Sequence, residues 1–138
     1  MRIMAIDYGD AHTGIAISDP TGFMTGYATV INAYRPEVVV QQITALVKEY
    51  GVEELVLGHP INMDGSRGPR SEKAHAMKAL LEEALPQPVI LWDERRTTID
   101  AHQILMNNGK NAKKRKKTVD AVAASLILEG YLTFKKFH

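Results

Sequence analysis

A change in the spacing of apolar residues along the chain constrains its fold more than any other feature. Residues 2–7, 13–18 and 24–31 are three short β-prone runs, and the turn signal DPTG at 19–22 separates the second from the third. From residue 36 onward, stretches with apolar residues every three or four positions alternate with short buried runs. The first pattern predicts an antiparallel meander, and the second predicts strands joined by helical crossovers.

The remaining elements follow from the same periodicity and from helix start and stop signals. Helices are predicted over 36–50, 71–85, from 97 or 98 to about 107, and 118–134, with strands over 54–58 and 89–92. Pro36 begins the first helix, Gly51 ends it, and Thr118 is predicted to cap the last one. We therefore expect an α/β fold with a five-stranded mixed sheet, antiparallel in its first three strands and parallel in its last two, with helices on both faces.

Size and composition limit the class of protein. The chain has 138 residues, of which 45% are hydrophobic, so we expect a single domain over residues 1–138. Cysteine is absent, which excludes disulfides and thiolate zinc sites. The N-terminal run reaches an acid after six residues, too soon for a signal peptide, and there is no stretch of about 18 apolar residues. These features predict a cytoplasmic protein without a membrane partner; no pattern predicts its oligomeric state.

One segment is strongly basic although the formal net charge is only +1. Six of the eight residues from 110 to 117 are basic: Lys110, Lys113, Lys114, Arg115, Lys116 and Lys117. Without these six, 11 of the 17 basic residues remain against 16 acidic ones. A mildly acidic body with one concentrated basic segment is typical of proteins that bind polyanions, although a solvated, disordered charge run has the same composition.

Carboxylates lie at the ends of two predicted strands and at the start of the last predicted helix. Asp7 ends the first strand, Asp93 and Glu94 follow the fifth, and Asp120 falls in the first turn after Thr118. Open α/β sheets place their sites at the carboxyl ends of strands. If one strand separates the first from the fifth, these ends lie about 10 Å apart. Acids across such a gap can share one or two Mg²⁺ or Mn²⁺ ions, which would support phosphodiester hydrolysis.

Each acid also has a simpler explanation. A strand-end acid is often a turn former, and an acid in the first turn of a helix complements the helix dipole. Asp93 and Glu94 are adjacent, so in an extended chain they point to opposite sides of the sheet. Only one of the two is therefore expected in the site, while the other pairs with Arg95, Arg96 or solvent.

Two loops are expected to support the site. Gly9 and Gly14 bracket the turn after the first strand, where glycine permits positive φ or close approach of a ligand, but also serves an ordinary hairpin. In the loop over 59–70, Asn62 and Asp64 lie near the predicted site, and Asp64 either orients a neighbouring arginine or bound strand or stabilises an Asx turn.

Basic residues near these acids are candidates for nucleic-acid binding. Arg95 and Arg96 can bind phosphates in a bidentate manner or balance local acids, and we expect one of each kind. The predicted phosphate-binding residues are Arg70, Arg95, Arg96, Lys113, Lys114, Arg115, Lys116 and Lys117. Such contacts give affinity that depends on salt and little on sequence. Among the histidines, only His59 lies in a motif loop, and none has metal-ligand spacing.

Four segments resemble one protein family: DYGDAHTGIAISD at 7–19, GHPINMDGSRGPR at 58–70, DERRTT at 93–98 and TVDAVAASLILEGYL at 118–132. They are similar to the YqgF family of pre-16S ribosomal RNA nucleases and Holliday-junction-resolvase-like proteins. The resemblance implies a ribonuclease H-like fold, divalent-metal cleavage of nucleic acid in maturation of the 16S rRNA 5′ end, and ribosomal particles as partners. It also implies an acidic triad at Asp7, Glu94 and Asp120.

Two departures from the junction resolvases of that fold concern the metal site. Those enzymes carry an acid after the fourth strand, where this chain has Gly58 and His59, and another three residues into the last helix, where it has Ala123. Cleavage of an RNA precursor is the first hypothesis and cleavage of branched DNA the second. A nucleic-acid-binding adaptor without catalysis is a third, and an actin-like nucleotide hydrolase is disfavoured because it needs two domains.

Overall fold

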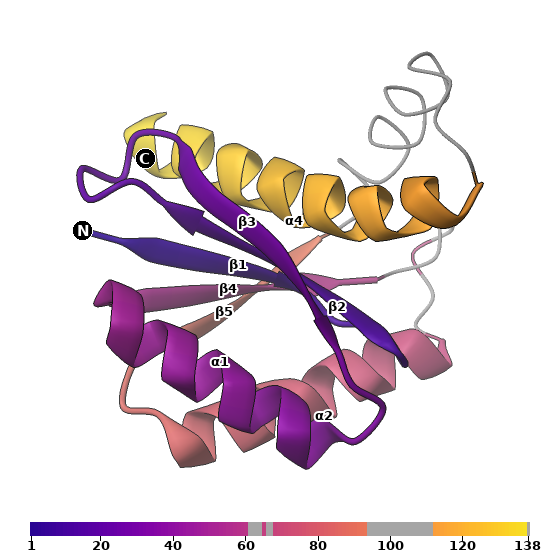
Figure 1. Cartoon of the computed structure of the whole chain (residues 1–138). Coiled ribbons are helices and arrows are strands. Elements are labelled where there is room, and N and C mark those ends of the chain that lie inside the picture. The colour runs from indigo at the N-terminus through magenta and orange to yellow at the C-terminus, as the bar shows by residue number, and fades with distance from the viewer. Residues whose placement is uncertain (61–64, 66–67, 94–111, 138) are drawn as a thin grey trace.

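The computed structural model describes residues 1–60, 65, 68–93 and 112–137, with the backbone alone for 112–120 and 137 (Figure 1). The strands are β1 (Ile3–Asp7), β2 (His12–Ser18), β3 (Thr25–Asn32), β4 (Glu54–His59) and β5 (Val89–Asp93), and the helices are α1 (Pro36–Tyr50), α2 (Pro69–Ala84) and α4 (Ala112–Phe137). Among these helices, none combines the length and the apolar character needed to cross a membrane.

The five strands form one sheet in the order β3-β2-β1-β4-β5. β1 is antiparallel to β2 and β2 to β3, whereas β4 is parallel to both β1 and β5. The predicted mixed sheet is therefore confirmed, including the single strand between the first and the fifth. Because β1, β4 and β5 are parallel, their carboxyl ends lie side by side at one border of the sheet, which we call the carboxyl edge.

Alternate residues of the strands pack against two different layers of helices. Met4, Ile6 and Leu57 belong to a core with residues of α1 and α2, while Ala5 and Val56 belong to a second core with α4. Figure 1 shows α1 and α2 on one face of the sheet and α4 on the other. Each buried aliphatic side chain contributes about 1.5–3 kcal/mol, so both layers are fixed by apolar contact.

Local signals explain most of the observed boundaries. Gly51 follows α1 with a φ of 66°, the left-handed conformation that favours glycine at the end of a helix. α2 begins at Pro69, two residues before the predicted start, because proline suits the first turn of a helix. The strand ends differ from prediction by one residue, and the predicted helix ending near residue 107 lies outside the described residues.

The predicted start of the last helix is wrong. α4 begins at Ala112, so Thr118 is not its cap, and residues 112–117 form helix instead of a connecting segment. Alanine, lysine and arginine are favourable helix formers, and here their propensity outweighs the capping signal of the threonine. Asp120 consequently lies in the third turn, where the interaction of a carboxylate with the helix dipole has faded.

The second half of α4 is anchored at the opposite edge of the sheet, at the start of β4. The Tyr131 hydroxyl donates a hydrogen bond to Glu54, and Lys135 Nζ donates to Glu54 Oε2 at 3.0 Å. Glu54 is only 7% exposed, and burial of Tyr131 together with this carboxylate raises the pKa of the tyrosine. α4 therefore runs antiparallel to β4, with its first half toward the carboxyl ends of the parallel strands (Figure 1).

We expect Tyr131→Phe to lower the free energy of unfolding by about 1–3 kcal/mol, because the buried Glu54 carboxylate loses a donor. Urea denaturation measures this change. Tyr34→Phe is the matched control, since that side chain is 82% exposed. Equal effects of the two substitutions would contradict a stabilising role for the bond between Tyr131 and Glu54.

Candidate active site

Asp7 ends β1 at the carboxyl edge of the sheet. It pairs with Gly14 of β2 and is half-buried. Ile3 and Ala5, which alternate with Met4 and Ile6, pack against α4, so Asp7 lies on the α4 side of the sheet. The structure thus places this predicted site residue beneath the helix that carries Asp120.

Strand register separates Asp93 from Asp7. Ile6 pairs with Leu57, and Gly58 pairs with Trp92, so Asp7 is level with Trp92. The Trp92 ring contacts Tyr131 of α4 edge-on at 5.8 Å, which places Trp92 on the α4 side. Asp93, the next residue, therefore lies on the opposite side, level with His59.

Among the described residues, the carboxylates of Asp10 and Glu54 are already paired, whereas that of Asp7 is not. Lys73 Nζ donates to Asp10 Oδ1 at 2.6 Å, and this bond, with the lysine charge, lowers the pKa of Asp10. Glu54 holds Tyr131 and Lys135. Over the described part of the chain, no side chain forms a hydrogen bond or an ion pair with the Asp7 carboxylate. A half-buried carboxylate without a counter-charge is suited to binding a cation.

The described residues contain one member of the predicted acidic triad with its side chain. Within them, no group of three or more acids or histidines is arranged to hold a metal ion. Glu94 lies outside the described residues, and Asp120 is described by its backbone only. The predictions for Asn62, Asp64, Arg95 and Arg96 likewise lie outside the described residues, and residues 113–117 are placed by backbone in the first turns of α4.

Of the two predicted glycines, Gly9 lies in the loop between β1 and β2, and Gly14 lies in β2. At Gly9, any Cβ would overlap the carbonyl oxygen of His12, so the close approach predicted there involves the loop itself. Gly14 lies inside β2, opposite Asp7. Arg70 is exposed in the first turn of α2, one turn before Lys73. Basic side chains therefore border the loop that follows Asp7.

Sequence reasoning missed a buried polar contact below this edge. His59 Nε2 lies 2.6 Å from Ser71 Oγ, and the two residues are 6% and 1% exposed. The His59 ring also contacts the His75 ring edge-on at 4.8 Å. The contact joins the end of β4 to the first turn of α2, so His59 fixes both ends of the loop between them. A serine two residues after a helix-starting proline was the available signal.

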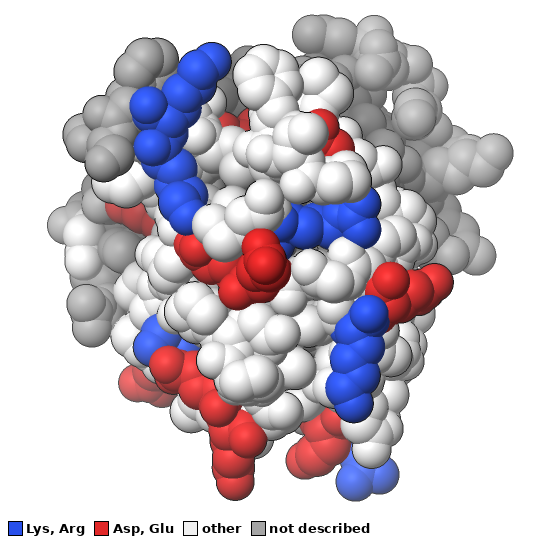
Figure 2. All heavy atoms as spheres, turned by 90° about the vertical axis from the view of Figure 1, so that its left-hand side faces the viewer, with Lys and Arg blue, Asp and Glu red and all other residues white. Residues whose placement is uncertain are grey.

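The opposite edge of the sheet does not have the charge distribution of a nucleic-acid interface. Figure 2, which faces the amino ends of β1, β4 and β5, shows lysines and arginines interspersed with acids over the described surface. At the start of β4, Glu54 pairs with Lys135 at 3.0 Å. A polyanion gains little from such a mixed surface.

Comparison with known proteins places this chain in a family. A family model described as "RuvX: Holliday junction resolvase" matches residues 1–134. The chain belongs to the RuvX family. A Halothermothrix orenii protein named "Putative pre-16S rRNA nuclease" is 45% identical over 139 residues, covering 100% of this chain and 99% of the relative. A Pelotomaculum thermopropionicum protein of the same name is 44% identical, covering 96% of this RuvX chain and 86% of the relative.

Solved structures share the fold of this RuvX chain. RuvC of Thermus thermophilus in complex with Holliday junction substrate has a TM-score of 0.64 at 14% identity, covering 98% of this chain and 96% of that one. The yeast mitochondrial Holliday junction resolvase has a TM-score of 0.61 at 13% identity, covering 97% and 78%. The fold is therefore ribonuclease H-like, as the sequence motifs implied.

We expect Ser71→Ala to destabilise the protein by about 1–3 kcal/mol, because it removes the buried hydrogen bond between Ser71 and the His59 ring. Chemical denaturation at pH 7.5 gives the change in the free energy of unfolding. Ser125→Ala is the control, because the hydrogen bond that the Ser125 hydroxyl donates among the described residues goes to the Ala121 carbonyl of its own helix. A Ser71→Ala variant as stable as Ser125→Ala would contradict this role.

Proposed function

We propose that this RuvX chain is a divalent-metal-dependent nuclease that hydrolyses phosphodiester bonds in precursor 16S rRNA, at the 5′ end of the mature sequence. The observation that carries the proposal is the 45% identity to a protein named for this activity over the full length of both chains. The position of Asp7 supports it, because a half-buried carboxylate at the carboxyl edge of a parallel sheet has no paired cation among the described residues. Such an activity belongs in the cytoplasm, with ribosomal particles as partners.

Glu94 and Asp120 are proposed to complete the site. Glu94 follows Asp93, so continued alternation would return its side chain to the side of Asp7. Asp120 precedes Ala124 by four residues and Ile127 by seven, and both of those pack against the sheet.

The direction of α4 supports the same assignment. Tyr131, which binds Glu54 at the start of β4, follows Asp120 by eleven residues, or about 16 Å of helix. From Glu54 to Gly58 the strand rises about 13 Å. The backbone of Asp120 is therefore about level with Gly58, and Gly58 is level with Asp7.

Carboxylate oxygens are the ligands that Mg²⁺ and Mn²⁺ prefer, so the proposed set of Asp7, Glu94 and Asp120 suits one or two such ions. When bound, the metal supplies an activated water and stabilises the charge on the leaving oxygen. The carboxylates would hold the metal ion at the carboxyl edge of the sheet. Asp93, on the other side of β5, is proposed to support the strand end instead of binding metal.

Basic residues on α4 and around the first loops are proposed to hold the phosphate backbone. Within α4, Lys113, Lys116 and Lys117 precede Asp120 by seven, four and three residues, which places them on its side of the helix. Arg70 lies at the same edge in the first turn of α2. Arg95 and Arg96 are proposed to contact phosphates beside Glu94. These contacts supply affinity, while the acids supply chemistry.

Branched DNA is the second candidate substrate. The description of the matching family as a Holliday junction resolvase favours it. The same acids would cleave either polymer, because the bond broken is a phosphodiester in both. Contacts to the 2′-hydroxyl distinguish RNA from DNA, so the choice is a matter of binding residues.

We expect Mg²⁺- or Mn²⁺-dependent cleavage of a labelled precursor 16S rRNA fragment, reduced at least 100-fold in Asp7→Asn, Glu94→Gln and Asp120→Asn with binding retained. The purified protein is tested with that RNA, single-stranded DNA and a four-way DNA junction, with metal or EDTA. Asp93→Asn is the matched control and should keep most of the activity. Cleavage that survives all three changes would refute the site, and binding without cleavage in the unmodified protein would favour an adaptor.

Neutralising Lys113, Lys116 and Lys117 to glutamine should weaken RNA binding and flatten its dependence on salt. Each lost phosphate contact should reduce the slope of log K against log salt by about 0.7–0.9. Lys48, Lys78 and Lys136, changed together, form a control of equal charge. The same slope in both triple variants would identify the segment as a solvated charge run.

A further inference from the structure

The longest stretch of the chain without a charged residue or histidine lies on its surface. Residues 20–34 contain fifteen consecutive uncharged residues and form the turn before β3, β3 itself and the two residues after it. Such a composition is usual for a buried strand. Here Phe23, Met24 and Tyr34 are 64%, 53% and 82% exposed.

β3 is also the outermost strand on its side of the sheet. Among the described residues it pairs with β2 alone. The Ala33 N–H donates to the Ala11 carbonyl, so the alternation of an antiparallel ladder directs the N–H and C=O groups of Ala28, Val30 and Asn32 outward. Edge strands are normally protected by charges, proline or bulges. β3 has one register shift near its start, opposite Ile17 and Ser18, and no charge or proline along its length.

We propose that β3 pairs antiparallel with β3 of a second copy of this chain, which joins two five-stranded sheets into one of ten strands. A strand paired with its own copy about a two-fold axis satisfies the same groups on both sides. β3 carries no charge, so a charged partner strand would gain no ion pairs from it. A second β3 matches it in length, twist and lack of charge.

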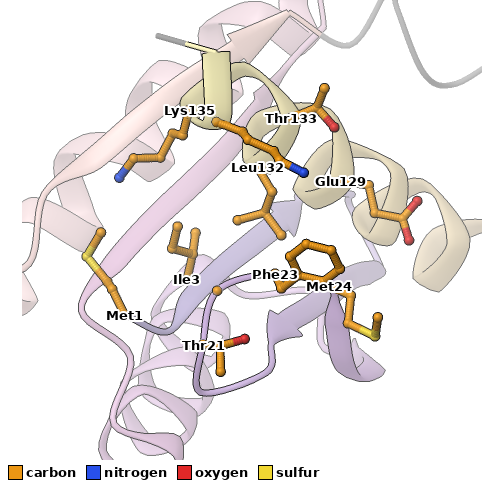
Figure 3. A pocket seen from close by; sticks show the side chains of 11 residues that line it. Met1, Ile3, Thr21, Phe23, Met24, Glu129, Leu132, Thr133 and Lys135 are labelled. Atoms are coloured by element: carbon orange, nitrogen blue, oxygen red, sulfur yellow. The ribbon is translucent and has the colours of Figure 1, made fainter.

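The two ends of the segment also complement each other. Phe23 and Met24, with Met1 and Leu132, line a cavity of about 620 Å³ between the turn before β3 and the second half of α4 (Figure 3). Tyr34 follows the other end of β3 and is the most exposed large apolar side chain among the described residues. In an antiparallel pair, Tyr34 of one copy lies beside the turn of the other. The pairing therefore brings each exposed tyrosine next to a cavity whose lining combines these apolar residues with Glu129, Lys135 and Lys136.

The helices leave room for this pairing. α4 packs most over β2, then over β1 and β3, so its axis lies about one and a half to two strand spacings from the proposed two-fold axis. The two α4 axes are then about 14–19 Å apart, wider than the 8–10 Å of helices in direct contact. The Tyr27 ring stacks on Tyr50 of α1, with ring centroids 5.0 Å apart. It therefore packs within its own chain and does not cover the outer side of β3.

Sedimentation equilibrium over about 1–100 μM tests the proposal. The unmodified protein should have about twice the 15.3 kDa mass of one chain, and Ala28→Lys should have the mass of one chain at the same concentrations. Ala28 is exposed, so the lysine adds a charge at the seam without entering the core. Ala76→Lys, on the exposed side of α2, is the control and should remain a dimer. A monomeric unmodified protein, or a dimeric Ala28→Lys variant, would overturn the proposal.

Cross-linking keeps the proposal testable if Ala28→Lys does not fold. The chain has no cysteine, so Ala28→Cys introduces a single thiol. A short bismaleimide should link Ala28→Cys into a covalent dimer and should leave Ala76→Cys unlinked. Equal yields of dimer from the two variants would show collisional cross-linking and would contradict the pairing of β3.

Discussion

Parallel pairing of β4 with both β1 and β5 is the constraint on which the rest of the structure depends. It brings the carboxyl ends of three strands to one edge, and its register makes Asp7 level with Gly58 and Trp92. A slip of one residue in β5 would move Asp93 to the side of the sheet on which Asp7 lies. The edge-on contact between the rings of Trp92 and Tyr131, with centroids 5.8 Å apart, opposes such a slip because the slip would turn Trp92 away from α4.

The anchoring of α4 is the second requirement. The helix covers the α4 side of the sheet through apolar contacts, but apolar contact alone does not fix where a helix stops along its axis. Glu54 fixes the position of α4 along its axis, because the buried Glu54 carboxylate accepts hydrogen bonds from both Tyr131 and Lys135. Burial of a carboxylate costs free energy unless donors satisfy it, so the helix is held in the one position that provides them.

Periodicity predicted the sheet and the helices on both its faces, because alternating and helical spacings of apolar residues depend only on which side of an element is buried. The start of α4 was predicted wrongly, since a capping threonine is a local signal and the propensity of the basic residues before it was stronger. The contact between His59 and Ser71 and the exposure of Phe23 depend on tertiary packing, which spacing along the chain does not record. The position of Asp7 at a strand end was visible in the sequence, and the roles of Asp7, Glu94 and Asp120 in a site remain predictions.

The length of α4 has a consequence for the proposed substrate. Its 26 residues span about 39 Å, whereas the strands of the sheet have five to eight residues and the longest rises about 27 Å. The first two turns therefore project beyond the sheet, with Lys113 about 10 Å along the axis from Asp120. If the proposed site is correct, a nucleic-acid strand bound to these first turns of α4 would be held about three nucleotides from the bond that is cut, at 3.4 Å per nucleotide. The helix would act as a ruler, setting the position of cleavage by distance instead of by base sequence.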